Sequence, residues 1–131
     1  LEEQIRHLEQ DGLPDVEWAY LREVNKMVRE GRFNTALNYC REKVNATGSL
    51  VLRERLADLY ARNDLYDDAG WQYEQVIEEA RTVETAVRVG ARWMLILRLL
   101  GDKERADKLE AIIREKWKGS EVLSWLATAQ P

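Results

Sequence analysis

The sequence predicts an all-α fold, and three observations support this. Apolar residues recur every three or four positions along almost the whole chain, and no segment alternates as a strand does. The 131 residues include only 7 Gly and 2 Pro, which is few for a turn-rich β-protein. The chain is 45% hydrophobic and 34% charged, enough of each for one domain with a packed core and a solvated surface.

The expected elements follow one another with breaks of only a few residues. An N-terminal helix or linker over 1–12 precedes three helix hairpins, at about 14–46, 50–80 and 83–117, within residues 13–118. A capping helix over 120–129 follows them. Because short breaks make consecutive helices antiparallel neighbours, we expect either a closed bundle or a stack of hairpins.

Each expected helix has an apolar stripe of its own. In chain order these stripes are Leu1, Ile5 and Leu8; Val16, Ala19, Tyr20, Val24, Met27 and Val28; Ala36, Leu37, Cys40 and Val44; Leu52, Leu56, Leu59 and Tyr60; Tyr66, Ala69, Tyr73, Val76, Ile77 and Ala80; Val83, Ala86, Val87, Gly90, Trp93, Met94, Leu97 and Leu100; Ala106, Leu109, Ile112, Ile113 and Trp117; and Val122, Leu123, Trp125 and Leu126.

Residues with turn and capping chemistry separate these stripes. Pro14 suits a first helical turn, and Gly31 and Gly101 suit helix ends. We expect loops at 45–49 and 63–64. The expected N-caps, chosen because their side-chain oxygens can accept from free backbone N–H groups, are Asn34, Ser49, Thr82 and Asp102.

The breaks inside the three hairpins resemble one another. Residues 31–37 align with 64–70 and with 101–107, which places Ala36, Ala69 and Ala106 at equivalent positions, 33 and 37 residues apart. Small residues at such positions let two helices approach closely. The four additional residues fall before the third hairpin, between 79 and 86, and are expected to lengthen a helix or a loop there.

The second hairpin carries a recognisable pattern. Leu56-Ala57-Asp58-Leu59-Tyr60, then Tyr66, Ala69 and Tyr73, resembles the Leu-Gly-x-x-Tyr … Ala-x-x-x-Phe pattern of the tetratricopeptide family, whose period is near 34. The resemblance covers about residues 17–117, and departs from the family at Val24, Met27, Trp93, Met94, Leu97 and Lys103. It implies an α-solenoid of three antiparallel helix hairpins.

The composition argues against catalysis, cofactors and metal ions. There is one histidine, His7, and one cysteine, Cys40, so neither a histidine-based metal cluster nor an internal disulfide is expected. Adjacent carboxylates such as Asp67 and Asp68 point about 100° apart on a helix and do not share a site. We find no glycine-rich phosphate loop. The sequence therefore predicts a non-enzymatic protein with no catalytic, cofactor or metal residues.

Location and partners are predicted from the same composition. The single cysteine fits a reducing compartment, which favours the cytoplasm, and no signal peptide or membrane-spanning stretch is visible. The chain begins at Leu1 rather than Met, which is compatible with a fragment or a processed product. The net charge of −4 disfavours a nucleic-acid partner.

The tetratricopeptide resemblance implies that the first helix of each hairpin lines a concave groove. These helices are rich in arginine, whose planar fork grips carboxylates in pairs, so an acidic or C-terminal peptide is the expected ligand. The alternative is that these arginines only pair with acids on the same helix surface. The expected peptide-binding residues are Trp18, Leu21, Arg22, Asn25, Arg29, Arg55, Asp58, Arg62, Arg88, Arg92, Leu95 and Arg98.

The expected function is that of a scaffold or adaptor that holds a peptide in this groove. One alternative is a self-association module, built on the apolar residues of 1–8 or on 117–126. A regulatory domain of a larger protein is another, and RNA binding is the least favoured. In the segment 93–100 only Arg98 is polar, and we expect 120–129 to cover it with Trp125 and Leu126 rather than a second subunit.

Overall fold

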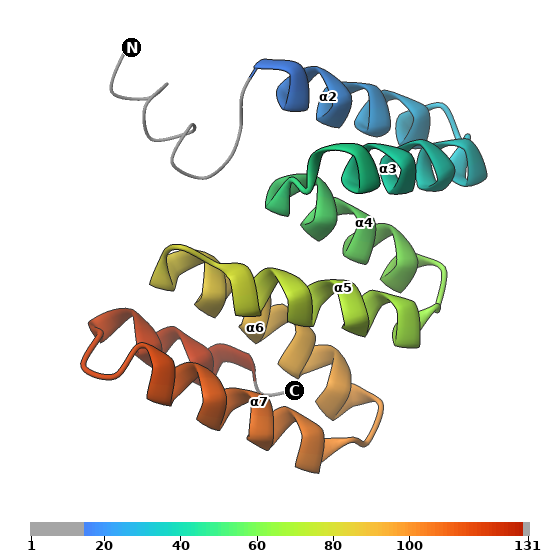
Figure 1. The fold of residues 1–131 in the computed structure, drawn as a ribbon. Helices are drawn as coiled ribbons and strands as arrows, with labels where there is room; N and C mark the ends of the chain where they lie inside the picture. The colour runs from blue at the N-terminus through green and yellow to red at the C-terminus, as the bar shows by residue number, and fades with distance from the viewer. Residues whose placement is uncertain (1–14, 130–131) are drawn as a thin grey trace. The chain divides into compact units, whose positions relative to one another are not determined.

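The computed structural model describes residues 15–129, apart from the side chain of Thr128, and these residues are almost entirely helical (Figure 1). No strand occurs among them, so the predicted all-α class is confirmed. The N-terminal helix expected over 1–12 lies outside the described residues. In order, the elements are α2 (Asp15–Arg29), α3 (Phe33–Thr47), α4 (Leu50–Arg62), α5 (Tyr66–Glu79), α6 (Val83–Leu99), α7 (Lys103–Lys116) and the 3₁₀ helix η1 (Glu121–Ala129).

The chain divides into two compact units, which are described separately. Unit 1 extends to Gln72 and unit 2 begins at Tyr73, so that α5 contributes to both. In unit 1, α3 packs against both α2 and α4, and α2 also contacts α4. The buried apolar side chains of these three helices are Val24, Met27, Ala36, Leu37, Cys40, Val44, Leu52, Leu56, Ala57, Leu59 and Tyr60.

The buried stripe of α2 differs from the expected one. Val16 is 50% exposed and Ala19 is exposed, whereas Glu17 is only 7% exposed. Glu17 lies seven residues before Val24, close to two helical turns, so its side chain points in nearly the same direction as that core residue. Val16 is rotated by about 100° from that direction. The sequence pattern assigned the apolar side chain to the core, but the structure buries the acid.

Three of the four predicted N-caps are confirmed. The side chains of Ser49, Thr82 and Asp102 each accept a hydrogen bond from the backbone N–H three residues further on, at 3.2–3.3 Å. The prediction for Asn34 is wrong, because α3 already begins at Phe33 and its cap has no side-chain hydrogen bond. The start of α3 therefore lacks the stabilisation that a side-chain cap provides.

The end of α3 also differs from prediction. Residues 45–47 were expected in a loop, but the helix continues through Thr47, whose hydroxyl donates to the Lys43 carbonyl at 2.7 Å. The helix then ends at Gly48, where φ is 69° and the backbone N–H donates to the Val44 carbonyl at 2.8 Å. A left-handed glycine is the usual way to satisfy the last carbonyls of a helix.

The turns inside the three hairpins have the same backbone geometry. Gly31, Asp64 and Gly101 occupy equivalent positions and have φ values of 76°, 60° and 87°. After each of them, the next backbone N–H donates to the carbonyl five residues before it, at 2.8–2.9 Å. This is the bond that closes a Schellman motif. The alanine at the equivalent place in each following helix, Ala36, Ala69 or Ala106, is completely buried, as expected of a close helix contact.

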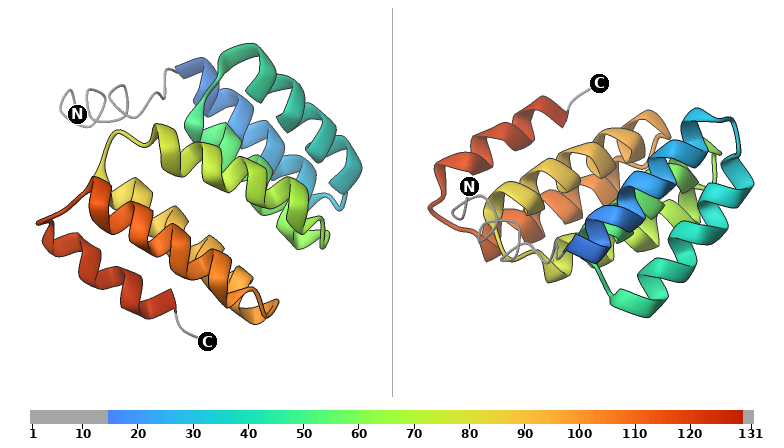
Figure 2. Two further views of the ribbon diagram at one scale, coloured as in Figure 1. Left: turned by 60° about the horizontal axis from the view of Figure 1, so that its bottom comes forward. Right: turned by 90° about the horizontal axis from the view of Figure 1, so that it is seen from above.

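Unit 2 is built around α6, which packs against α7 and η1 (Figure 2). At the contact with α7, a Cβ atom added to Gly90 would collide with the Cδ1 atom of Ile113, whose side chain is 1% exposed. Glycine therefore lets the two helices approach closely without displacing the Ile113 side chain. With 17 residues against 13 in α4, α6 is the element that takes up the four additional residues.

The C-terminal segment covers α6 as predicted, and Leu126 is buried as expected, but Trp125 is not. In η1 the buried side chains are Leu123, Leu126 and Ala129, while Trp125 is 54% exposed. A 3₁₀ helix has three residues per turn, so side chains three apart lie above one another. The three-residue spacing of these apolar side chains therefore presents a single face to the core, and Trp125 falls outside it.

Candidate peptide-binding face

Eight of the twelve predicted binding residues lie on α2 and α4 in unit 1, and we call them the arginine face. On each helix they recur every three or four positions, which places them along one side. The two rows are joined where the Nε of Arg55 donates to the Oδ1 of Asn25 at 2.8 Å. The arginine face consists of Trp18, Leu21, Arg22, Asn25 and Arg29 of α2 with Arg55, Asp58 and Arg62 of α4.

Three guanidinium groups of the arginine face are available to a ligand. Arg22, Arg29 and Arg62 are exposed, and none of them forms a hydrogen bond or an ion pair with any residue that the structure describes. Trp18 and Leu21 are half-buried and offer apolar surface on the same row. The face thus combines positive charge with apolar contact area. That combination is typical of surfaces that recognise acidic peptide segments.

The remaining predicted residues belong to α6 in unit 2, where Arg88 is exposed and Arg92 and Leu95 are half-buried. Arg98 was expected to face the groove, but the structure gives it another role. Its side chain is 7% exposed and its guanidinium lies 3.1 Å from Asp107, 3.0 Å from Glu110 and 3.1 Å from the carbonyl oxygen of Ala129.

Arg98 thereby links three elements, α6, α7 and η1, and we call these contacts the Arg98 clamp. Burial by itself lowers the pKa of Arg98, but the hydrogen bonds and charges of Glu110 and Asp107 outweigh it, so the pKa is raised. Lys103 and Arg98 lower the pKa of Asp107. Burial alone would raise the pKa of Glu110, but Arg114 and Arg98 overcome this and lower it. All of these charges are satisfied within unit 2.

Sequence reasoning missed the burial of Glu17. Burial raises the pKa of its carboxyl group, while a hydrogen bond with Ser49, the N-cap of α4, acts in the opposite direction. The Oε2 atom is buried and has no hydrogen-bond partner among the residues that the structure describes. Nothing in the sequence marked this residue, because an acid in the first turn of a helix is ordinarily a solvated group that interacts with the helix dipole.

Cys40 is a core residue, as its position on the apolar stripe predicts. It is completely buried, and its Sγ donates to the Leu52 carbonyl at 3.4 Å. Burial raises the pKa of the thiol to about 12, although Arg55 acts in the opposite direction. A thiol that stays protonated is a poor nucleophile, so Cys40 contributes packing rather than reactivity.

Comparison of the chain with protein-family models, with curated proteins and with solved structures found no match. Within residues 15–129, no three His, Cys, Asp or Glu side chains gather as a metal ion would require. The described helices also include none with both the length and the hydropathy of a membrane-crossing segment.

Proposed function

We propose that the chain is a non-enzymatic protein-binding module that holds an acidic peptide segment against the arginine face of unit 1. The observation that carries this proposal is the presence of three exposed arginines, Arg22, Arg29 and Arg62, on two adjacent helices, none of which has a partner within residues 15–129. Exposed arginine side chains that form no ion pair or hydrogen bond contribute little to the stability of the fold. Their gathering on one face beside Trp18 and Leu21 is better explained by a ligand.

The peptide would be held by two kinds of contact. Carboxylates of the ligand would accept paired hydrogen bonds from the planar guanidinium groups, and these bonds would set the position of the ligand along the helices. Apolar side chains of the ligand would pack on Trp18 and Leu21. The Arg55–Asn25 hydrogen bond keeps the two helices in register, so Arg55 serves mainly to position the face.

We also propose that the three hairpins are tetratricopeptide-like repeats. The three turns with one backbone geometry, at Gly31, Asp64 and Gly101, support this. The packing in unit 1 also supports it, because α3 contacts α2 and α4, and α2 and α4, the first helices of their hairpins, contact each other. In repeat proteins of this kind the binding surface is formed by corresponding helices of successive repeats. That is the relation between α2 and α4.

The proposal can be tested with a fluorescently labelled peptide of Glu and Leu residues and a counterpart in which Lys replaces every Glu. The full chain is expected to bind the Glu peptide, with an affinity that falls as salt is added, and to bind the Lys peptide weakly at this face. The triple variant Arg22→Glu/Arg29→Glu/Arg62→Glu is expected to lose roughly tenfold or more in affinity for the Glu peptide.

A matched control changes the net charge equally at sites away from the arginine face. Arg32→Glu/Lys108→Glu/Lys118→Glu alters three exposed cations and is expected to retain most of the binding. Circular dichroism should show that both triple variants keep the helicity of the parent chain. Equal losses of affinity in the two variants would mean that net charge, and not the arginine face, governs binding, and the proposal would fail.

A further inference from the structure

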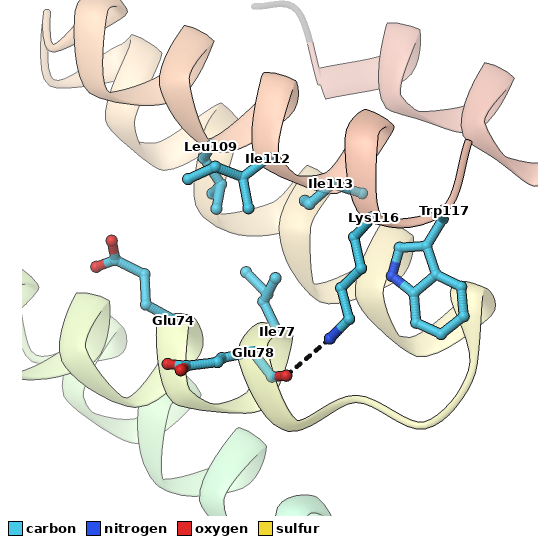
Figure 3. A pocket seen from close by; sticks show the side chains of 8 residues that line it. All are labelled: Glu74, Ile77, Glu78, Leu109, Ile112, Ile113, Lys116 and Trp117. Atoms are coloured by element: carbon cyan, nitrogen blue, oxygen red, sulfur yellow. Dashed lines mark hydrogen bonds between the residues drawn. The ribbon is translucent and has the colours of Figure 1, made fainter.

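Unit 2 contains a second surface with ligand-binding character, a pocket of about 350 Å³ between the C-terminal half of α5 and α7 (Figure 3). Its apolar lining comes from Ile77 of α5 and from Leu109, Ile112 and Ile113 of α7. Ile112 is 62% exposed, so its side chain offers apolar surface beside the cavity. We call this site the α5–α7 pocket.

The two ends of the α5–α7 pocket differ in charge. Figure 3 shows the carboxylates of Glu74 and Glu78 on one side and Trp117 on the other, with Ile77 and Lys116 between them. Glu74 is paired with Arg105 at 2.6 Å. The carboxylate of Glu78 is exposed and forms no ion pair among the residues that the structure describes.

The C-terminus of α5 adds to the negative charge on the acidic side of the pocket. The last turn of this helix contains Glu78 and Glu79 and no basic residue, although the carbonyl end of a helix already carries partial negative charge. Lys116 offsets part of this, since its Nζ donates to the Glu78 carbonyl at 2.8 Å. The Glu78 carboxylate itself has no ion-pair partner among the described residues. This end of the pocket therefore attracts a cation.

The opposite end has a hydrogen-bond donor without an acceptor. The Nε1 atom of Trp117 is buried and has no hydrogen-bond partner. In Figure 3 this atom lies on the side of the indole ring that faces Lys116 and the pocket. Buried donors in folded proteins nearly always have an acceptor. A bound backbone carbonyl would supply one.

We propose that the α5–α7 pocket binds a segment of a partner protein that carries a bulky apolar side chain and, within one helical turn of it, a Lys or Arg. The apolar side chain would occupy the space between Ile77 and Ile112, and the basic side chain would meet Glu78. A backbone carbonyl of the segment would accept from Trp117. The charge required is opposite to that expected at the arginine face, so this surface is independent of the proposed function.

The sharpest experiment begins with selection of short random peptides on the immobilised full chain, without assuming a sequence. The enriched peptides are expected to combine a bulky apolar residue with a nearby Lys or Arg. Their binding should shift the Nε1–H resonance of Trp117 downfield in two-dimensional NMR, because this proton gains an acceptor. The resonance is assigned by its loss in Trp117→Phe.

Two pairs of variants test the lining. Ile112→Ser is expected to weaken the selected peptides by roughly tenfold or more, while Leu99→Ser, at an equally exposed apolar residue elsewhere in unit 2, has little effect. Glu78→Lys should reverse the charge preference, so that a peptide with Glu in place of its basic residue now binds better. Glu79→Lys makes the same change one residue away, outside the lining, and should not.

Several outcomes would overturn the inference. One is a selection that enriches nothing, and another is peptides that bind without shifting the Trp117 resonance. Equal binding to the Ile112→Ser and Leu99→Ser variants would exclude the pocket as the site. A dimer in sedimentation experiments that Ile112→Ser converts to a monomer would assign the pocket to a second copy of this chain instead. Binding that survives in the arginine-face triple variant separates this result from the test of the proposed function.

Discussion

At the scale of single residues, the most informative side chain in unit 1 is Glu17. It is 7% exposed, and one of its oxygens has no hydrogen-bond partner. A buried carboxyl group is more easily accommodated when it is protonated, since the charged form loses its hydration. The raised pKa of Glu17 follows from this burial. Its charge at neutral pH is therefore a cost to the folded state.

The variant Glu17→Gln tests this directly. The pKa of Glu17 is higher in the folded chain than the ordinary value of 4.5, so wild-type stability decreases as the pH rises through the folded pKa. The neutral amide removes this loss and can keep the contact with Ser49. We expect a higher free energy of unfolding than wild type at pH 7 in urea titrations, with the difference closing towards pH 4.

The exposed acid Glu42 on α3 provides the control, because Glu42→Gln removes the same charge without any burial. Its free energy of unfolding should stay close to that of the wild type over the same pH range. If Glu17→Gln is less stable than wild type at pH 7, the charged carboxylate is favoured in the folded state and the interpretation is wrong.

Gly90 provides the corresponding test in unit 2. Alanine at this position gains about 1 kcal/mol of helix propensity, but its Cβ atom meets Ile113 in a well-packed contact, and overpacking costs roughly 1–3 kcal/mol. We expect Gly90→Ala to be destabilising in chemical denaturation. Ile113→Val removes the Cδ1 atom that would collide. In that background the same alanine should be neutral or stabilising, and purely additive effects would contradict the steric account.

At the scale of helices, Arg98 was expected to bind a ligand, but its side chain instead links α6, α7 and η1. Its guanidinium bonds to α7 and to the end of η1, so one side chain links α7 to a segment whose buried side chains include the apolar Leu123, Leu126 and Ala129. Hydrogen bonds to charged groups contribute about 1.5–3 kcal/mol each, more than a surface ion pair. The position of η1 should therefore depend on Arg98.

Replacement of Arg98 by Met tests the clamp. Loss of the charged hydrogen bonds is expected to cost about 1–3 kcal/mol in free energy of unfolding at neutral pH. Arg114→Met, which removes only an exposed pair with Glu110 one helical turn away, should cost less than about 0.5 kcal/mol. Hydrogen exchange at the amides of η1 should increase in the first variant and not in the second.

The clamp also predicts a pH dependence. The pKa values of Asp107 and Glu110 are lowered from their ordinary values of 3.8 and 4.5, so the unfolded chain takes up these protons first as the pH falls. Their contribution to stability is present above about pH 4.5 and is lost as the pH falls through the folded pKa values. The loss should be smaller in Arg98→Met, and equal acid sensitivity in both proteins would contradict the role of the clamp.

At the scale of the whole chain, the net charge of −4 conceals regions of opposite sign. Among the described residues, unit 1 has unpartnered arginines on the arginine face, while unit 2 has an unpaired carboxylate, that of Glu78, beside an apolar pocket. The proposed ligands are correspondingly opposite in charge. The two sets of variants described above should therefore affect different peptides, which is the behaviour expected of an adaptor with two independent sites.

Much of the helical organisation could be predicted without the structure. Helix periodicity identified every described element, and Ser49, Thr82 and Asp102 marked helix starts because a side-chain oxygen at that position satisfies a free N–H. These are interactions between residues close in sequence. The prediction failed at Asn34, where more than one residue could begin the helix and local chemistry did not decide between them.

The sequence by itself determined the all-α class, the approximate positions of the breaks and the three equivalent turns, because each depends on contacts within a few residues. Only the tertiary structure decided which charged groups face solvent. Arg22 and Arg98 look alike in sequence, yet the first is exposed with no partner in the described part of the chain and the second is enclosed by Asp107 and Glu110. The role of a charge depends on the groups that distant helices bring to it, and helical periodicity carries no information about those groups.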